Sequence, residues 1–173
     1  LSYEDLHRKV CEFAAMLRAN GIQKGDRVAI YMGMVPEAVI GMLACARIGA
    51  PHTVVFGGFA ADALRDRMND CQAKAVLTQD GAWRRGKVVP LKETVDDALR
   101  GSPSVEKVFV YKRLSDADCA ITMQDGRDVD WYDAVAKTDI ALGKEAEIVD
   151  AEHPAVFSLK CSRSAPSTTA GRS

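Results

Sequence analysis

The feature that most constrains the fold is an alternation of short apolar runs with longer amphipathic segments. The short β-prone runs lie at residues 27–32, 52–56, 75–78 and 108–111. The segments with helical periodicity lie at residues 2–21, 36–49, 60–69, 90–99 and 131–135. Strands and helices that alternate through joints of a few residues predict parallel βαβ units. We therefore expect an α/β fold, in which a partial doubly wound parallel sheet carries helices on both faces.

Two joints in this pattern predict where a ligand binds. Gly57 and Gly58 break the chain directly after the run at residues 52–56, and a polar segment at residues 79–87 follows the next run. Ligands of open parallel sheets bind beyond the carboxyl ends of the strands. We therefore expect both joints at the ligand edge of the sheet, with residues 79–87 as a loop.

Composition excludes several classes of partner. The 173 residues are 47% hydrophobic and carry 23 basic and 24 acidic side chains, which is typical of one soluble globular domain. The net charge of −1, with no basic stripe, argues against nucleic acid as a partner. The longest apolar stretch, residues 35–46, is too short to span a membrane, and no secretory signal is visible. We predict a cytoplasmic protein with no membrane contact and no evident protein partner.

The residues that often carry catalysis or metals are dispersed. Five cysteines form no CxxC pair and have no histidine at metal-ligand spacing, which favours reduced thiols in the cytosol. His52 opens a strand, where it could face a ligand, but nothing assigns it a role. Five aspartates crowd residues 116–130 without an EF-hand pattern, so we expect a solvated loop with a hairpin around residues 121–129. No catalytic residue and no metal site are predicted.

The last residues differ from the rest of the chain. Residues 158–173 hold five serines, two threonines and three basic side chains, with no acidic or aromatic residue. Such a segment cannot build a packed core. We expect one domain over residues 1–157 and a disordered tail over residues 158–173.

Several linked blocks then resemble a known family. They lie, in order, at residues 25–32, 36–37, 42–50, 54–59, 90–92, 95–99 and 126–131. In sequence and spacing they are similar to AMP-forming acetyl-CoA synthetases of the adenylate-forming superfamily. The resemblance covers residues 1–157, which it identifies as part of the large AMP-binding domain.

The resemblance implies a two-step ligase. Such enzymes adenylate acetate with ATP and Mg²⁺, release diphosphate, and transfer the acyl group to coenzyme A with release of AMP. The family loop that matches Arg84, Arg85, Gly86 and Lys87 contacts the nucleotide end of coenzyme A. Cationic donors suit phosphates, and Gly86 allows close backbone approach. The family prefers Arg where this chain has Lys87, which keeps the charge without the bidentate fork.

The match ends after Phe157, where the family has a glycine-rich loop that holds the ATP phosphates. Ser162 and Ser164 keep the register, but Arg163 and Pro166 replace loop glycines and cannot form the backbone cradle. A shifted reading frame or a truncated gene model would produce such a loss of match. The family's acyl pocket and C-terminal domain match nothing within these 173 residues. We therefore predict a fragment of an ATP-dependent acetate–CoA ligase that is inactive alone.

Three alternatives stay open at this point. The chain could belong to a propionyl-CoA or other short-acyl-CoA synthetase, because the acyl pocket is not included. It could be a non-catalytic module that binds coenzyme A or another nucleotide through residues 84–87. It could also be a structural remnant whose half sheet exposes apolar surface and does not fold stably.

Overall fold

A computed structural model describes residues 1–157 of the protein. Five strands form one parallel sheet in the order β2-β1-β3-β6-β7. These strands are β1 (Val28–Met32), β2 (His52–Phe56), β3 (Ala75–Gln79), β6 (Lys107–Tyr111) and β7 (Asp128–Asp130). A separate antiparallel pair consists of β4 (Ala82–Arg84) and β5 (Lys87–Val89). The predicted α/β class with a parallel sheet is confirmed.

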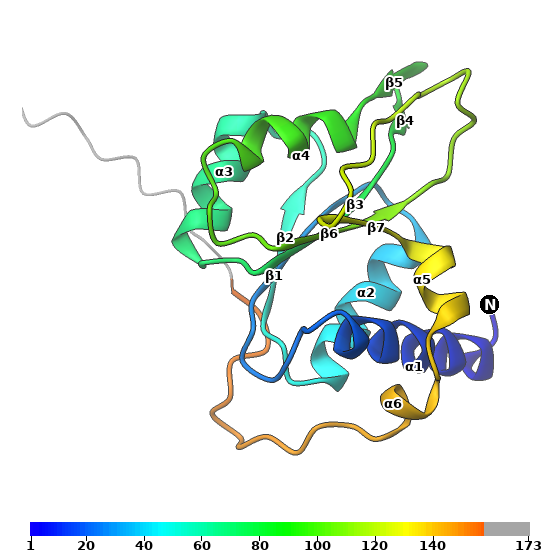
Figure 1. Ribbon diagram of the computed structural model, residues 1–173, viewed down its shortest axis with the longest axis vertical. Helices are drawn as coiled ribbons and strands as arrows, with labels where there is room; N and C mark the ends of the chain where they lie inside the picture. Colours follow the sequence, from blue (N-terminus) through cyan, green and yellow to red (C-terminus); the bar gives the residue numbers. More distant parts are fainter. Residues whose placement is uncertain (158–173) are drawn as a thin grey trace, which may run out of the picture.

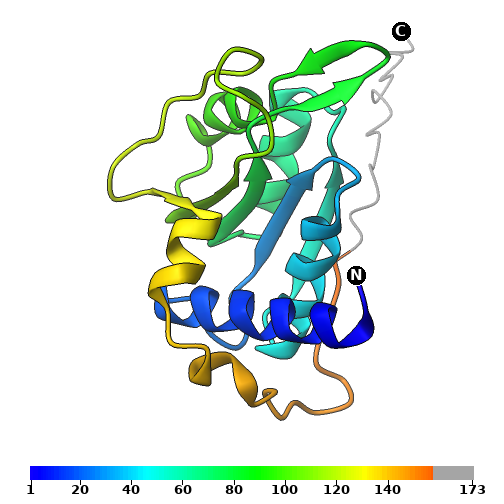
Figure 2. The same ribbon diagram turned by 90° about the vertical axis from the view of Figure 1, so that its right-hand side faces the viewer.

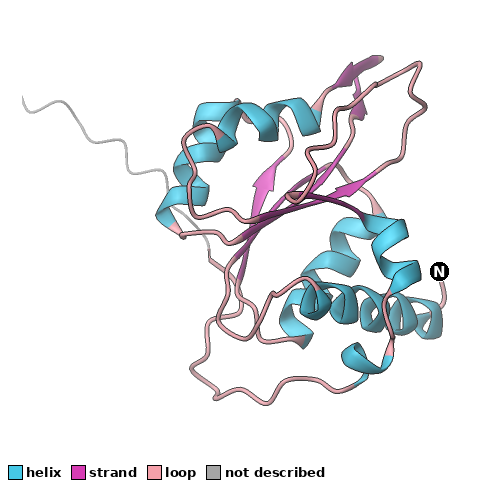
Figure 3. Cartoon of the chain, viewed as in Figure 1, coloured by secondary structure: helices cyan, strands magenta, loops and turns pink. Residues whose placement is uncertain are grey.

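Helices cover both faces of the sheet, as the alternation predicts. They are α1 (Tyr3–Ala19), α2 (Pro36–Arg47), α3 (Ala61–Asp70), α4 (Leu91–Leu99), α5 (Trp131–Lys137) and α6 (Ala141–Lys144). Figure 1 shows α3 and α4 on one face and α1, α2, α5 and α6 on the other. Figure 3 shows the same three layers coloured by secondary structure, and Figure 2 shows the molecule turned by 90°.

The apolar strands supply two cores, one for each layer of helices. Side chains alternate along a strand, so Ile30 and Met32 face the core with α1 and α2, whereas Ala29 and Tyr31 face α3 and α4. All five residues of β1 are buried. Burial on both faces explains why the sequence shows continuous apolar runs in place of alternating polar and apolar residues.

The prediction of a hairpin around residues 121–129 is wrong. Residues 128–130 form β7, which pairs in parallel with β6 at the edge of the sheet. A long-range ion pair holds this segment at the edge of the sheet. The side chain of Asp128 is fully buried and lies 2.9 Å from Lys92 Nζ on α4. Val129 meanwhile packs against the core with α1 and α2. These contacts anchor the segment to the sheet and to α4.

The chain returns to the sheet at its other edge, beside β2. The backbone N–H of His52 donates to the carbonyl of Ala155 (3.0 Å), and the N–H of Phe157 donates to the carbonyl of His52 (2.8 Å). His52 is 5% exposed, and burial lowers its pKa. It lies at the amino end of β2, so it does not face the ligand edge. The predicted tail and phosphate-loop residues lie outside the described residues.

Candidate functional site

A cavity of about 280 Å³ lies at the carboxyl edge of the sheet. Its lining residues follow or end three of the parallel strands, β1, β2 and β6, or belong to the β4–β5 hairpin: Gly33, Met34, Phe56, Gly57, Ala82, Trp83, Arg84, Val89 and Arg113. The Gly57 joint and the segment 79–87 therefore meet at one edge, which confirms the prediction made from the alternation of strands and helices.

The two glycines of this joint are needed for close approach. A Cβ on Gly57 would lie 3.0 Å from the carbonyl oxygen of Met32, and one on Gly58 would overlap the guanidinium of Arg84. The hydroxyl of Tyr31 fixes the same turn by donating to the carbonyl of Phe59 (2.7 Å). Burial raises the pKa of Tyr31 above its ordinary value of 10.0, and a tyrosine hydroxyl already keeps its proton for such a bond at neutral pH.

The segment predicted as a polar loop forms a β-hairpin instead. β4 and β5 pair around Arg85 and Gly86, whose φ angles are +51° and +75°. Two consecutive left-handed residues are what a two-residue type I′ turn requires. A Cβ on Gly86 would meet nothing within 4 Å, so the turn conformation is what favours glycine there. Arg85 takes a conformation that is uncommon for a residue with a side chain.

The hairpin brings one predicted cation into the cavity. Arg84 lines it, with the guanidinium carbon 5.0 Å from the centroid of the Phe56 ring. Arg85 and Lys87 are exposed at the tip and are not among the lining residues. Within residues 1–157, none of these three cations forms a salt bridge. Their charges are therefore available to a ligand.

Four further lining residues have no role assigned from the sequence: Met34, Phe56, Trp83 and Arg113. Trp83 is 56% exposed and Phe56 is 58% exposed, so two aromatic side chains offer open apolar surface to the cavity. Met34 and Arg113 each stand two residues beyond the end of a strand. The rule that ligands bind beyond the carboxyl ends of strands would have found both. An aromatic surface beside cations suits a ligand with a flat ring and a phosphate.

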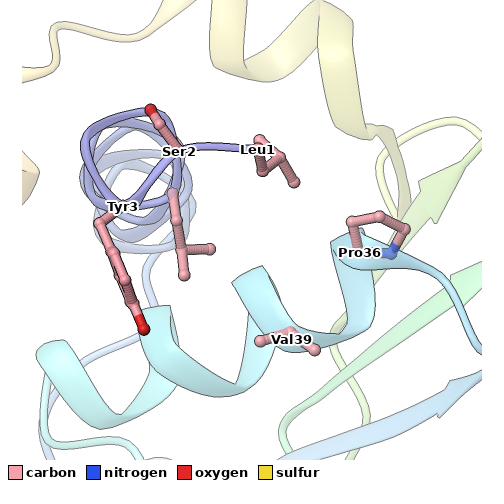
Figure 4. A pocket seen from close by; sticks show the side chains of 6 residues that line it. Leu1, Ser2, Tyr3, Pro36 and Val39 are labelled. Atoms are coloured by element: carbon pink, nitrogen blue, oxygen red, sulfur yellow. The ribbon is translucent and has the colours of Figure 1, made fainter.

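A second cavity, of about 240 Å³, lies between the first turn of α1 and helix α2. Figure 4 shows Leu1, Tyr3, Pro36 and Val39 around it. Its lining side chains carry no charge. An anionic ligand therefore finds partners at the carboxyl edge of the sheet and none here.

Residues 1–157 contain no group of three or more His, Cys, Asp or Glu side chains that could hold a metal ion. None of the helices in this part of the chain combines the length and the apolarity needed to cross a membrane.

The fold and the cavity define an open α/β domain with a cationic and aromatic ligand edge. A family model described as AMP-binding enzyme matches residues 1–158. The chain belongs to this family of AMP-binding enzymes.

Curated relatives of the chain are acetyl-coenzyme A synthetases. That of Novosphingobium aromaticivorans is 48% identical over 154 residues, which cover 89% of this chain and 23% of the relative. That of Gemmatimonas aurantiaca is 51% identical over 154 residues, which cover 87% of this chain and 23% of the relative. An acetoacetyl-CoA synthetase structure from Streptomyces lividans matches with a TM-score of 0.77 at 30% identity, covering 90% of this chain and 23% of the other. The chain thus spans about a quarter of the length of these proteins.

Proposed function

We propose that this chain is part of an AMP-forming acetate–CoA ligase and binds the nucleotide end of coenzyme A. The complete reaction would convert acetate, ATP and coenzyme A into acetyl-CoA, AMP and diphosphate. Acetate is the proposed acid because the curated relatives that are 48% and 51% identical to the chain are acetyl-coenzyme A synthetases.

The observation that carries this proposal is the position of Arg84. Its guanidinium lies over the Phe56 ring at the wall of the cavity, and no carboxylate of the described residues neutralises it. Coenzyme A carries an adenine ring and several phosphates, which match an aromatic wall and an arginine. Arg85, Gly86 and Lys87 complete the proposed contact, with two more cations at the tip of the hairpin.

ATP and Mg²⁺ belong to the complete enzyme in this proposal. The residues that match the family's phosphate loop lie outside the described residues, so no contact with ATP is assigned here. Acid activation requires ATP, the acid and Mg²⁺ held together. We expect the 173-residue chain alone to release no AMP above background from acetate, ATP and coenzyme A, and release above background would contradict this expectation.

Calorimetry with coenzyme A tests the proposed contact. Arg84→Ala should weaken binding about tenfold, the loss expected for one charge-assisted contact. Arg8→Ala is the control, because Arg8 pairs with Glu12 (2.6 Å) on α1, on the other face of the sheet. Equal affinity of the Arg84→Ala variant and the unsubstituted chain would reject the assignment.

A chimaera tests the enzymatic part of the proposal. Residues 1–157 would replace the matching segment of the Novosphingobium aromaticivorans acetyl-CoA synthetase. We expect the chimaera to form AMP with acetate, and Arg84→Ala in it to raise the KM for coenzyme A more than it lowers kcat. A folded chimaera without acetate-dependent AMP formation would contradict the proposal.

The proposed reaction takes place in the cytoplasm. Cys11, Cys45, Cys71 and Cys119 are all free thiols, and Cys11, Cys45 and Cys71 are buried. Free, dispersed cysteines support a reducing compartment.

A further inference from the structure

Arg113 is a cation of the cavity that the family motif does not include. It lies in the loop after β6, two residues beyond Tyr111, and lines the cavity together with Arg84. The adjacent Lys112 is engaged elsewhere, with its Nζ 3.2 Å from Asp130. Arg113 forms no salt bridge with any of the described residues. Of these two neighbouring cations, Arg113 alone is free to bind a ligand in the cavity.

A buried carboxylate fixes the backbone of this loop. Asp80 is 2% exposed and directly follows β3. Its Oδ2 accepts hydrogen bonds from the backbone N–H groups of Arg113 (2.8 Å) and Leu114 (2.6 Å). Its Oδ1 accepts from the N–H of Gly81 (2.7 Å), at the base of the hairpin that carries Arg84. One carboxylate therefore holds the two loops that bring arginines to the cavity.

Gln79, the residue before Asp80, holds a third loop that lines the cavity. The side chain of Gln79 is fully buried. Its Oε1 accepts from the N–H of Gly33 (2.9 Å), and its Nε2 donates to the carbonyl of Gly81 (2.6 Å). Buried polar groups that are fully hydrogen-bonded fix the segments they join. Gln79 at the end of β3 and Asp80 directly after it thus connect the loops after β1, β3 and β6.

We propose that Arg113 is a second anion-binding residue of this cavity and that Asp80 is the positioning residue that holds it there. The ligand group is a phosphate of a phosphorylated nucleotide, because two arginines on separate loops border an aromatic wall. The inference rests on the proposed function, since it concerns the same cavity. It adds a residue from another part of the chain to the contacts at positions 84–87.

Calorimetry with adenosine 3′,5′-bisphosphate tests the role of Arg113. This probe carries an adenine ring and phosphates without the rest of coenzyme A. We expect Arg113→Ala to weaken its binding about tenfold and to reduce the loss of affinity on adding salt. Lys112→Ala removes the same charge one residue earlier and should change affinity less than about twofold, because Lys112 pairs with Asp130.

A second pair of variants tests the positioning role. Asp80→Asn keeps the size of the side chain but replaces one accepting oxygen by a donating NH₂ group, so either Gly81 or the pair Arg113 and Leu114 loses its acceptor. Thr78→Val is the control, because Thr78 is fully buried in β3 and its hydroxyl donates to the carbonyl of Tyr31 (3.0 Å) without touching these loops. We expect Asp80→Asn, but not Thr78→Val, to weaken bisphosphate binding and to speed amide exchange at Gly81 or at Arg113 and Leu114.

The outcomes separate this inference from the proposed function. Coenzyme A binding that depends on Arg84 but not on Arg113 would overturn the inference alone. Bisphosphate binding that depends on Arg113, with no binding of coenzyme A, would overturn the coenzyme A assignment alone. If the folded chain binds neither probe, both are wrong. If Asp80→Asn leaves affinity and amide exchange as in Thr78→Val, the positioning role is wrong.

Discussion

Aromatic side chains occupy two contrasting regions, the core beneath α1 and α5 and the wall of the cavity. In the core, Phe13 and Trp131 are 0% and 3% exposed, and their rings stack with centroids 3.5 Å apart. At the cavity, Phe56 and Trp83 are both more than half exposed. The core rings have their partners within the fold, whereas the cavity rings keep open surface for a ligand. The comparison separates residues that stabilise the domain from residues that we propose bind a ligand.

Charged side chains show the same contrast. Lys92 is 1% exposed, and its Nζ lies 2.7 Å from Asp96 and 2.9 Å from Asp128. Arg84 and Arg113 at the cavity have no such carboxylate among the described residues. A buried charge that is paired joins parts of the fold, and an exposed one without a partner can serve a ligand.

The largest expected change in unfolding free energy comes from replacing the two tryptophans with alanine in separate variants. Trp131→Ala should cost about 3–5 kcal/mol of unfolding free energy, because it leaves a cavity beside Phe13. Trp83→Ala should cost about 1 kcal/mol or less but weaken coenzyme A binding, since Trp83 is exposed at the cavity. Chemical denaturation and calorimetry on both variants measure the two effects. Equal losses of unfolding free energy in the two variants would contradict the distinction between core and cavity rings.

Gly57→Ala and Gly58→Ala test the contrast between stability and binding at two neighbouring positions. Gly57→Ala should cost about 1–3 kcal/mol, because the new methyl group approaches the backbone carbonyl of Met32. Gly58→Ala meets the flexible end of Arg84 and the edge of the Phe56 ring, whose Cε1 would lie 2.7 Å from the new Cβ. Both side chains are exposed at the cavity, so the substitution should displace them and weaken coenzyme A binding with a smaller loss of stability than Gly57→Ala. Thermal unfolding and calorimetry distinguish the two. A larger loss of stability at Gly58 would contradict the expectation.

The ion pairs of the core predict an acid-sensitive stability. Burial alone would raise the pKa of Asp128, but hydrogen bonds from Arg127, Gln124 and Lys92 outweigh it and lower that pKa from 3.8. The stabilisation is therefore present above pH 3.8 and is lost as pH falls below it towards the native pKa. Denaturation between pH 7 and pH 3 should show this loss. Asp128→Asn should be less stable at pH 7 and lose less on acidification, and an unchanged pH dependence in that variant would contradict the assignment.

The smallest effect concerns the hairpin turn. Arg85→Asn should stabilise the chain by about 0.5–1 kcal/mol, because asparagine tolerates the left-handed conformation that Arg85 adopts. The same variant removes a cation that we propose contacts coenzyme A, so affinity should fall while stability rises. Denaturation and calorimetry measure both. A variant that loses stability would show that the arginine contributes more to the turn than its backbone strain suggests.

The sequence predicted the parts of the fold that depend on local pattern. Continuous apolar runs located β1, β2, β3 and β6, and the sheet rule placed Gly57 and the segment 79–87 at one edge. The hairpin was missed because Arg-Gly is not the usual Asn-Gly or Asp-Gly signal for a type I′ turn. β7 was missed because Asp128 and Asp130 are polar, and their partners Lys92 and Lys112 lie 36 and 18 positions earlier in the sequence.

Some residues of the candidate site could likewise be predicted from the sequence, and others could not. The hairpin cations stood out through a local motif, and Arg84 does line the cavity. The roles of Asp80 and Arg113 depend on hydrogen bonds between residues 33 and 34 positions apart, which no local pattern reveals. Roles of this kind become visible only when the strands are placed side by side.

The parallel pairing of the sheet also has a consequence for how the chain acquires its structure. Neighbouring strands of the sheet can meet only after the intervening helices are brought into place, and closing such long segments slows folding. The β4–β5 hairpin needs only a two-residue turn, and hairpins of this kind form within microseconds. The element that presents Arg84 can therefore take shape before the sheet, and it becomes a wall of the cavity only when β3 and β6 assemble.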